Sequence, residues 1–299
     1  MSHRFDPTIL REYDIRGVFG KTLHPEAAFA LGGGFGTLAY RGAGEGKIAV
    51  GYDGRLSSPA LEAALVEGLQ ASGAQVVRIG LGPTPMLYFA EVSEQDVIGG
   101  IQVTGSHNPA DHNGFKMVLE GRPVFGEQIL QLGRMAEAGD WIAGSGCAER
   151  REILHRYVDG LIEGLGDISH DRLAALRIGW DAGNGAAGPA LELLTRKLPG
   201  EHHLLFTQVD GAFPNHHPDP TIPGNLADLR ALVAANSLHF GVAFDGDGDR
   251  IGVIDALGRV IEGDQLLMIF AEDLLREWPN STVVADGKAS SALFDRISL

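Results

Sequence analysis

The sequence repeats one local design, a strand followed by a glycine-containing turn and a helix, and this repeat limits the fold more than any other feature. In the first copy, a strand pattern at 47–52 leads through Asp53-Gly54-Arg55 into a helical pattern at 60–72, and another strand pattern follows at 75–79. A second copy starts at residue 177 and shares the tetrapeptide Pro-Ala-Leu-Glu with the first. Strands that alternate with helices favour parallel sheets covered by helices. We therefore predict repeated α/β domains.

A third copy lies close to residue 299. Asp286-Gly287-Lys288 corresponds to Asp53-Gly54-Arg55, with a strand predicted at 282–285 and a helix at 290–299. No return strand pattern follows, and a single strand–helix unit cannot pair both edges of its strand. We therefore expect the chain to be an N-terminal fragment of a larger protein. The alternative is that the last segment docks onto the second domain as an added edge.

Composition indicates where the domains divide. Gly, Ala and Ser dominate residues 138–146, and an amphipathic helix predicted at 150–165 could join two domains. We expect a first domain at 1–149, a second at 150–256, and the incomplete start of a third at 257–299.

Two predicted helices of the first domain carry local signals. The helix at 25–38 contains Gly32-Gly33-Gly34, which would either let it pack closely against a neighbour or weaken it. Ser57 or Ser58 before Pro59 is the N-cap signal for the helix at 60–72.

Charge and cysteine content restrict the partners and the compartment. The formal net charge of -15 argues against a nucleic-acid or anionic-membrane partner, because no basic patch offsets the repulsion. The single cysteine, Cys147, rules out an internal disulfide framework and fits a reducing compartment. The first residues contain no apolar leader segment, and no later run is long and uncharged enough to span a bilayer. We expect a cytoplasmic protein and favour a monomer, although the sequence does not decide the oligomeric state.

A polar loop follows the apolar strand pattern that begins at Val97. The strand breaks at Gly105, and the loop Ser106-His107-Asn108-Pro109 follows, which places Ser106 at its tip. Taken alone, this stretch is also what an ordinary strand-to-loop turn with a surface histidine looks like.

An acidic loop follows the apolar run at 239–244. In Asp245-Gly246-Asp247-Gly248-Asp249, glycines between the carboxylates let the backbone curl so that all three surround one point. Three like charges repel, and a divalent cation such as Mg²⁺ or Ca²⁺ is the simplest compensation. An EF-hand is excluded, because Arg250 stands where its sixth position needs Gly and Ala256 where its twelfth needs Glu. The alternative is an acidic, glycine-rich hairpin turn.

A serine and a metal site together favour phosphoryl transfer. That chemistry requires positioning and charge neutralisation more than covalent work by the protein. A serine that carries the group, a metal that contacts its oxygens and a few fixed cations would suffice. Arg250 would be placed to hold a phosphate oxygen, and Lys116 is a candidate cation or proton carrier. An isolated lysine of this kind is usually a surface residue.

At this point the motifs match a family. They resemble the α-D-phosphohexomutase superfamily, and two of them resemble its bacterial phosphomannomutase/phosphoglucomutase branch in particular. The resemblance covers essentially the whole chain, with the motifs in the right order. The motifs are Tyr13-Asp14-Ile15-Arg16-Gly17, Thr104-Gly105-Ser106-His107-Asn108-Pro109, Asn113-Gly114-Phe115-Lys116, residues 213–220, and Asp245-Gly246-Asp247-Gly248-Asp249-Arg250.

The resemblance implies a fold, a reaction and a set of residues. The fold is a series of three-layer α/β/α domains with mixed sheets, the third incomplete here. The reaction interconverts hexose 1-phosphate and 6-phosphate of mannose or glucose through a phosphoserine and a bisphosphorylated sugar, with glucose 1,6-bisphosphate as activator. One Mg²⁺ would be bound by Ser106, Asp245, Asp247 and Asp249. Catalysis and substrate binding would fall to Ser106, His107, Lys116, Arg16, Arg250, Tyr13, Asn108 and Lys288.

Two other functions remain open. The first is a non-catalytic fragment that binds a phosphosugar or a metal. The second is an aspartyl-phosphate phosphatase of the haloacid-dehalogenase type, with Asp245 as the nucleophile. Against the phosphatase, Asp249 occupies a place where that family prefers Thr or Val, and Ser106 would have no role. If the chain is part of a mutase, we expect the chain alone to be weakly active or inactive.

Overall fold

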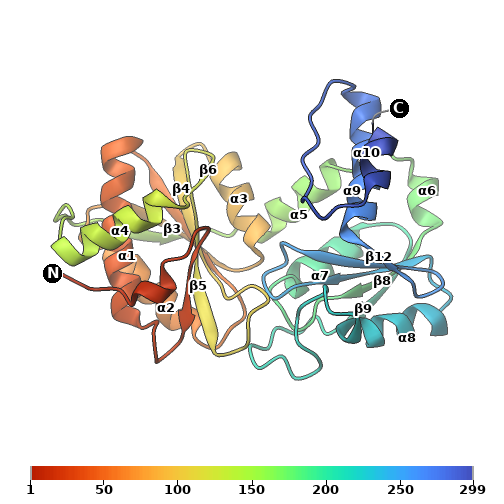
Figure 1. The fold of residues 1–299 in the computed structure, drawn as a ribbon, viewed down its shortest axis with the longest axis horizontal. Helices are drawn as coiled ribbons and strands as arrows, with labels where there is room; N and C mark the ends of the chain where they lie inside the picture. The colour runs from red at the N-terminus through yellow and green to blue at the C-terminus, as the bar shows by residue number, and fades with distance from the viewer. Residues whose placement is uncertain (1, 298–299) are drawn as a thin grey trace.

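The computed structural model describes residues 2–297, which form two α/β lobes side by side (Figure 1). Within these residues, the N-terminal lobe contains a seven-stranded sheet and the other lobe a five-stranded sheet. The first sheet contains β1 (Ile15–Val18), β2 (Lys47–Tyr52), β3 (Gln75–Leu81), β4 (Val97–Val103), β5 (His112–Leu119), β6 (Arg122–Pro123) and β7 (Ala148–Arg150). The second contains β8 (Arg177–Asp181), β9 (Glu201–Leu205), β10 (Phe240–Phe244), β11 (Ile251–Asp255) and β12 (Val260–Ile261).

Helices connect these strands and cover the faces of the sheets. Those of the first lobe are η1 (Pro7–Ile9), α1 (Pro25–Gly42), α2 (Ser58–Ala71), α3 (Thr84–Ser93) and α4 (Glu127–Ala138). The remaining ones are α5 (Leu154–Glu163), α6 (His170–Ala174), α7 (Gly188–Lys197), η2 (Pro223–Leu226), α8 (Ala227–Ala235), α9 (Gly263–Glu277) and α10 (Ser291–Ile297). No helix among the described residues combines the length and the apolarity needed to cross a membrane.

The first sheet has the order β1-β5-β4-β2-β3-β7. Strands β4, β2, β3 and β7 run parallel, while β5 pairs antiparallel with both β4 and β1. The second sheet has the order β12-β11-β10-β8-β9 and is mixed in the same way, with β10, β8 and β9 parallel. The predicted α/β class with mixed sheets is therefore confirmed.

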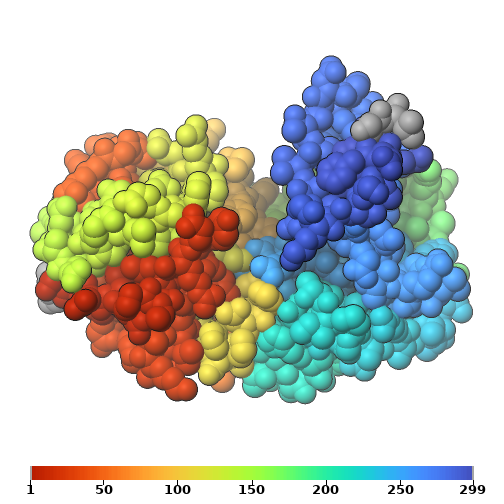
Figure 2. All heavy atoms as spheres, in the orientation of Figure 1, coloured from red at the N-terminus to blue at the C-terminus, as the bar shows by residue number. Residues whose placement is uncertain are grey.

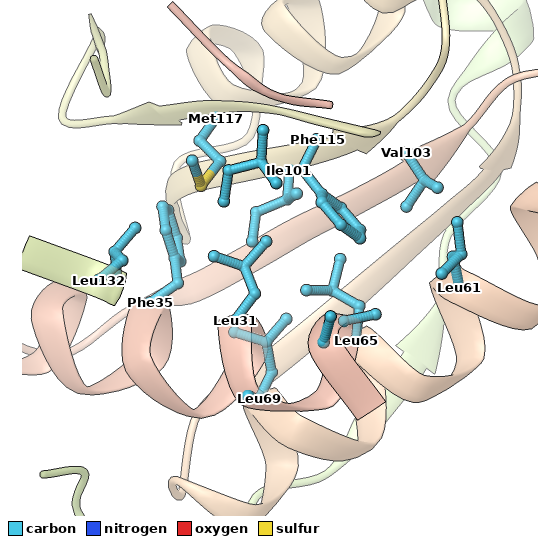
Figure 3. Packing of buried hydrophobic residues seen from close by; sticks show 14 of the residues in the cluster. Leu31, Phe35, Leu61, Leu65, Leu69, Ile101, Val103, Phe115, Met117 and Leu132 are labelled. Atoms are coloured by element: carbon cyan, nitrogen blue, oxygen red, sulfur yellow. The ribbon is translucent and has the colours of Figure 1, made fainter. Parts of the chain in front are cut away.

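The core of the first lobe lies between its sheet and helices α1, α2 and α4. Leu31 and Phe35 of α1 pack with Leu65 of α2 against Ile101 and Phe115 of the sheet (Figure 3). A smaller cluster under α3 and α5 covers the opposite face. Both faces of the parallel strands are thus buried, as such strands require.

The glycines of α1 allow α2 to approach closely. A Cβ atom on Gly32 would lie 2.3 Å from the carbonyl oxygen of Leu65, and one on Gly68 of α2 would lie 2.0 Å from the carbonyl oxygen of Phe29. Gly32 of the glycine run therefore serves close helix packing, the first of the two interpretations that the sequence left open.

Three local predictions can be compared with the structure, and the first of them is wrong. Residues 282–285 form no strand, because no other strand lies beside them to accept and donate hydrogen bonds within the described part of the chain. Ser57 is the N-cap residue of α2 and Pro59 lies in its first turn, as predicted, but no side chain caps the helix; the Ser58 hydroxyl donates to Asp53 instead. The helix predicted at 290–299 is α10, and residues 298 and 299 lie outside the described residues.

Candidate active site

Two loops meet where the parallel strands of the two lobes end. Strand β4 leads into residues 104–111, called here the Ser106 loop, and β10 leads into residues 245–250, called the acidic loop. In Figure 2 the yellow segment that contains the Ser106 loop lies against the second lobe. The carboxyl ends of parallel strands are where α/β proteins usually bind their ligands.

Ser106 is held in an unusual backbone conformation at this edge. Its φ angle is 48°, in the left-handed region that residues other than glycine rarely adopt. Its N–H donates to the hydroxyl oxygen of Thr104 at 2.8 Å, and its own hydroxyl donates to Oδ2 of Asp245 at 2.7 Å. The Ser106 hydroxyl is therefore fixed against the acidic loop of the other lobe.

The acidic loop gathers its three carboxylates as the spacing predicted. Ligand oxygens of Asp245, Asp247 and Asp249 all lie within 4.8 Å of one another, with Asp245 and Asp247 fully buried and Asp249 exposed. Oδ1 of Asp245 accepts hydrogen bonds from the backbone N–H groups of Asp249 and Arg250, both at 3.1 Å. The two loops are in close contact at Gly246, where a Cβ atom would lie only 2.4 Å from the carbonyl oxygen of Ser106. A residue with a side chain at this position would push the loops apart.

Lys116 connects β5 to the acidic loop. Its ammonium group lies 2.7 Å from Oδ2 of Asp247 and also contacts Asp249. Burial raises the pKa of Asp245, and the charges of Asp247 and Asp249 add to the rise. Burial also acts to raise the pKa of Asp247, but the charge and hydrogen bond of Lys116 have the larger effect, so the pKa of that carboxyl is lowered. Burial by itself would lower the pKa of Lys116, yet its two carboxylate partners raise it.

The charges and free oxygens of this site fit a divalent cation. One ammonium group faces three carboxylates, which leaves two negative charges for a divalent cation or protons to balance. Oδ1 of Asp247 is buried and has no hydrogen-bond partner, which leaves its lone pairs free for a metal. Carboxylate oxygens are the ligands that hard divalent cations prefer.

Arg16 reaches the Ser106 loop from β1. Its side chain is 6% exposed, donates to the carbonyl oxygen of Gly105, and forms an ion pair with Asp14. Its Nε–H is buried and has no partner. A donor of this kind, beside the predicted phosphoryl carrier, is free to hold an anionic oxygen.

His107 is held by the second lobe. Its Nδ1 lies 3.0 Å from Oδ2 of Asp219, whose other oxygen accepts from the backbone N–H and the hydroxyl of Thr221. The ring of His217 donates from Nε2 to the carbonyl oxygen of His107 at 2.6 Å. Residues 213–220, which the sequence could only place within a motif, therefore lie against the Ser106 loop.

The structure gathers only part of the predicted site. It brings together Ser106, His107, Lys116, Arg16 and the three aspartates. The side chain of Tyr13 is 80% exposed, and those of Arg250 and Lys288 are also exposed, with no hydrogen bond or ion pair to the two loops. Asn108 contributes its carbonyl oxygen, which accepts from Arg55.

Sequence reasoning missed several residues that hold these loops. Thr84, at the start of α3, donates from both its backbone N–H and its hydroxyl to Asp247. Asp53 and Arg55, which follow β2, contact the Ser106 loop. A signal for the last two was present, because Asp-Gly-Arg directly follows a strand at the same edge of the sheet as Ser106.

Comparison with known families agrees with this geometry. Residues 7–142 match the model of phosphoglucomutase/phosphomannomutase α/β/α domain I, and residues 155–258 match that of α/β/α domain II. The chain belongs to the phosphoglucomutase/phosphomannomutase family, and the resemblance seen in the motifs is confirmed.

Individual relatives carry related names. A phosphomannomutase/phosphoglucomutase of Pseudomonas putida is 44% identical over 290 residues, which are 96% of this chain and 60% of that protein. A phosphoglucomutase of Neisseria gonorrhoeae is 42% identical over 288 residues, 95% of this chain and 61% of that protein. A solved phosphoglucomutase/phosphomannomutase family protein of Burkholderia thailandensis superposes with a TM-score of 0.91 at 42% identity, over 98% of this chain and 64% of that one. The chain thus spans about three fifths of the length of the curated relatives it matches.

Proposed function

We propose that the chain carries the phosphoryl-transfer centre of a phosphohexomutase that interconverts the 1- and 6-phosphates of glucose or mannose. One observation supports this most directly. The Ser106 hydroxyl lies 2.7 Å from Asp245 in a group of three carboxylates, two of which contact Lys116. A serine that carries a phosphoryl group beside a cation site needs this arrangement. The relatives' names support the same reaction.

In the proposed step, phosphoserine 106 passes its phosphoryl group to a hydroxyl of a hexose phosphate. The sugar oxygen bonds to phosphorus while the bond from phosphorus to Oγ of Ser106 breaks. Lys116 donates a proton to the serine oxygen and takes up the proton of the sugar hydroxyl, so it begins and ends the step as an ammonium ion. The bisphosphorylated sugar then turns over and returns its other phosphate to Ser106 by the reverse step.

The remaining residues act by holding charge and orientation. Asp245, Asp247 and Asp249, together with the phosphoryl group on Ser106, would hold one Mg²⁺. When bound, the ion would neutralise charge on the transferring group. Arg16 would bind phosphoryl oxygens through its free Nε–H, and His107 would meet the sugar from the position that Asp219 gives it. We also propose substrate contacts for Tyr13, Asn108, Arg250 and Lys288, on the resemblance of their motifs.

The proposal also covers the setting of the reaction. Glucose 1,6-bisphosphate would serve as activator because it can phosphorylate an unmodified Ser106. We propose a cytoplasmic protein, since a free, exposed Cys147 fits a reducing compartment, and we favour a monomer. The proposed domain division, at residues 150 and 257, leaves the Ser106 loop in the first domain and the acidic loop in the second.

The test is intact-mass measurement with phosphopeptide mapping. After incubation with glucose 1,6-bisphosphate and Mg²⁺, we expect one phosphoryl group on Ser106, removed when glucose 6-phosphate or mannose 6-phosphate is added. Ser106→Ala is the control and should remain unmodified.

Two outcomes would reject the proposal. An unmodified Ser106 in a chain that binds Mg²⁺ would leave only a metal-binding or phosphosugar-binding fragment. A label that hydroxylamine removes would indicate an acyl phosphate, and hence the phosphatase reaction at Asp245. The structure does not favour that reaction, because both oxygens of Asp245 accept hydrogen bonds from the protein.

A further inference from the structure

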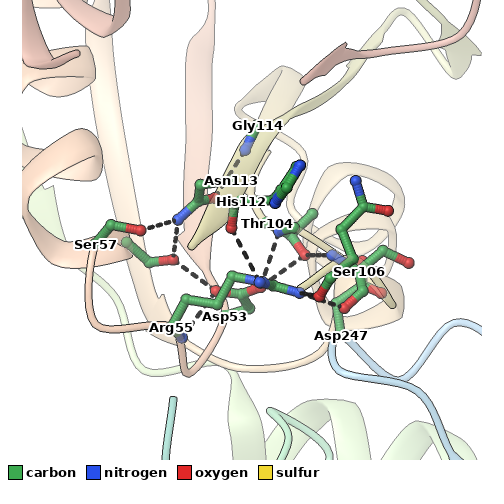
Figure 4. A network of polar contacts seen from close by, with 12 residues as sticks. Asp53, Arg55, Ser57, Thr104, Ser106, His112, Asn113, Gly114 and Asp247 are labelled. Atoms are coloured by element: carbon green, nitrogen blue, oxygen red, sulfur yellow. Dashed lines mark hydrogen bonds and ion pairs between the residues drawn. The ribbon is translucent and has the colours of Figure 1, made fainter. Parts of the chain in front are cut away.

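Arg55 lies completely buried beneath the Ser106 loop, and all of its donors are used (Figure 4). A guanidinium group has five N–H donors in one plane. Each faces an oxygen, and four of those oxygens are backbone carbonyls of the loop or of the strand that follows it. The acceptors are Oδ2 of Asp53 and the carbonyl oxygens of Ser106, Asn108, Pro109 and His112.

Asp53 holds the other side of the same loop. Its Oδ2 accepts from the Thr104 hydroxyl at 2.8 Å and from the backbone N–H of Gly105 at 3.1 Å. Its Oδ1 accepts from the backbone N–H of Arg55 and from the Ser58 hydroxyl. Asp53 therefore fixes Arg55 while it binds the donors that precede Ser106, and Arg55 binds the acceptors that follow.

This arrangement explains how Ser106 keeps its left-handed backbone. A residue in that region costs about 1–3 kcal/mol and persists only where its surroundings hold it. Arg55 donates to the carbonyl oxygen of Ser106 at 2.8 Å, and the same carbonyl is the atom against which Gly246 packs. The Arg55 guanidinium also lies over the ring of Phe213, 5.4 Å from its centroid, on the second lobe.

We propose that Arg55, held by Asp53, is the positioning residue that aims Oγ of Ser106 at the acidic loop for phosphoryl transfer. This inference rests on the proposed function. Arg55 acts through the backbone of the loop and does not contact the transferring group. A misplacement of about 1 Å at a reacting centre can cost about 100-fold in rate. The hydrogen bonds of the Arg55 guanidinium group are therefore required for phosphoryl transfer and not only for folding.

Arginine is required here because no other side chain has enough donors. Lysine keeps the charge but has three donors, so at least two of the five hydrogen bonds that Arg55 makes are lost. Methionine fills a similar volume but makes none of the five hydrogen bonds; of the four carbonyl groups, that of Pro109 still accepts from the backbone N–H of His112. The two substitutions separate the positive charge from the planar hydrogen bonds.

The experiment compares phosphorylation of Ser106 in the whole chain and in three variants. Arg55→Met and Arg55→Lys are the test variants, and glucose 1,6-bisphosphate with Mg²⁺ is the donor. Arg78→Met is the matched control, because Arg78 binds the buried Glu62 in a two-point ion pair and makes no hydrogen bond to the Ser106 loop within the described residues. Rates come from intact mass, folding from far-UV circular dichroism and urea unfolding, and loop order from hydrogen exchange of residues 104–112.

We expect Arg55→Met to lower the transfer rate about 100-fold, and Arg55→Lys to lower it at least about 10-fold, with faster exchange in the loop. Arg78→Met should lose stability yet change the rate less than about threefold. Should Arg55→Met fail to fold, Arg55→Lys decides the question.

The inference would be overturned if Arg55→Lys or Arg55→Met folds and shows the same transfer rate and the same hydrogen exchange in residues 104–112 as the chain without a substitution. So would an equal loss of rate in Arg78→Met, which would reduce the role of Arg55 to stability. If the chain without any substitution takes up no phosphoryl group, the proposed function fails. Hydrogen exchange then still decides whether Arg55 positions the loop.

Discussion

Lys116 sets the charge balance of the site at the scale of single residues. It contacts two of the three carboxylates, and its own side chain is 15% exposed. Removing one partner of a buried pair leaves the other charge without compensation. The effect should depend on whether a cation is bound, because a metal can replace the lost positive charge.

We predict that Lys116→Met destabilises the metal-free chain by about 3 kcal/mol, and that saturating Mg²⁺ recovers part of the loss. Urea unfolding with EDTA and with Mg²⁺ measures both quantities. Lys47→Met is the control, since Lys47 pairs with Asp96 and Glu149 at the surface, where such pairs contribute about 1 kcal/mol or less. Equal losses in the two variants would contradict the role given to Lys116.

His216 makes stability depend on pH through its pair with Asp181. Its Nε2 lies 2.9 Å from Oδ2 of Asp181, and this hydrogen bond raises the pKa of His216 although burial opposes the rise. A histidine with a raised folded pKa contributes its full stability below the unfolded value, about 6.5, and loses that contribution as pH rises through the folded value.

His216→Gln should therefore be more destabilised relative to the unmodified chain at pH about 5.5 than at pH about 9. The measurement is urea unfolding across this range, with the exposed His155→Gln as the control. If the loss of unfolding free energy in His216→Gln stays constant or grows as pH rises, the pair does not titrate as described.

Close contact between α1 and α2 is a property of two elements. The glycines at the crossing leave no space for a side chain, whereas Gly42, at the end of α1, has no neighbouring atom within 4 Å of a built Cβ. We predict that Gly68→Ala destabilises the chain by about 1–3 kcal/mol, because the helices must separate. Gly42→Ala, which adds the same methyl group, should be neutral or stabilising by up to about 1 kcal/mol. Urea unfolding of both variants is the test, and equal effects would argue against the close approach.

Elements were predicted well where local pattern decides them. The segments β2, α2 and β3 follow from periodicity and from turn residues. Strand β7 was missed because its three residues are all exposed and form a strand only by pairing with the edge of β3. Residues 282–285 show the converse. Their β-branched run suggests a strand, but a strand also needs a neighbour to pair with.

The residues of the site, too, were predicted where local sequence decides their position and missed where the tertiary fold decides it. The three aspartates and Ser106 could be read from spacing, because each group lies within a few residues of sequence. For Arg55 the sequence signals only its place at this edge of the sheet; its role could not be predicted, since it depends on where the chain directs four carbonyl groups more than fifty residues later. The pairing of His107 with Asp219 likewise depends on how the two lobes meet.

Across the whole molecule, polar groups of the proposed site connect the two lobes. Ser106 donates to Asp245, Thr84 to Asp247, and Lys116 contacts Asp247 and Asp249. The carboxylates that draw these groups together also repel one another. A cation at the acidic loop would remove that repulsion and so stabilise both lobes at their junction.

Mg²⁺ should therefore raise the thermal midpoint of the whole chain, by an amount equivalent to about 2.7 kcal/mol at about 100 times its dissociation constant. Asp249→Ala removes the exposed ligand and should abolish this response while changing the metal-free chain by about 1 kcal/mol or less. Asp167→Ala, a change at an exposed aspartate distant in sequence from both loops, should keep the full response. Thermal unfolding with Mg²⁺ and with EDTA measures all three. Stabilisation that survives in Asp249→Ala would mean that the ion binds elsewhere, and the junction of the lobes would then depend on the direct hydrogen bonds alone.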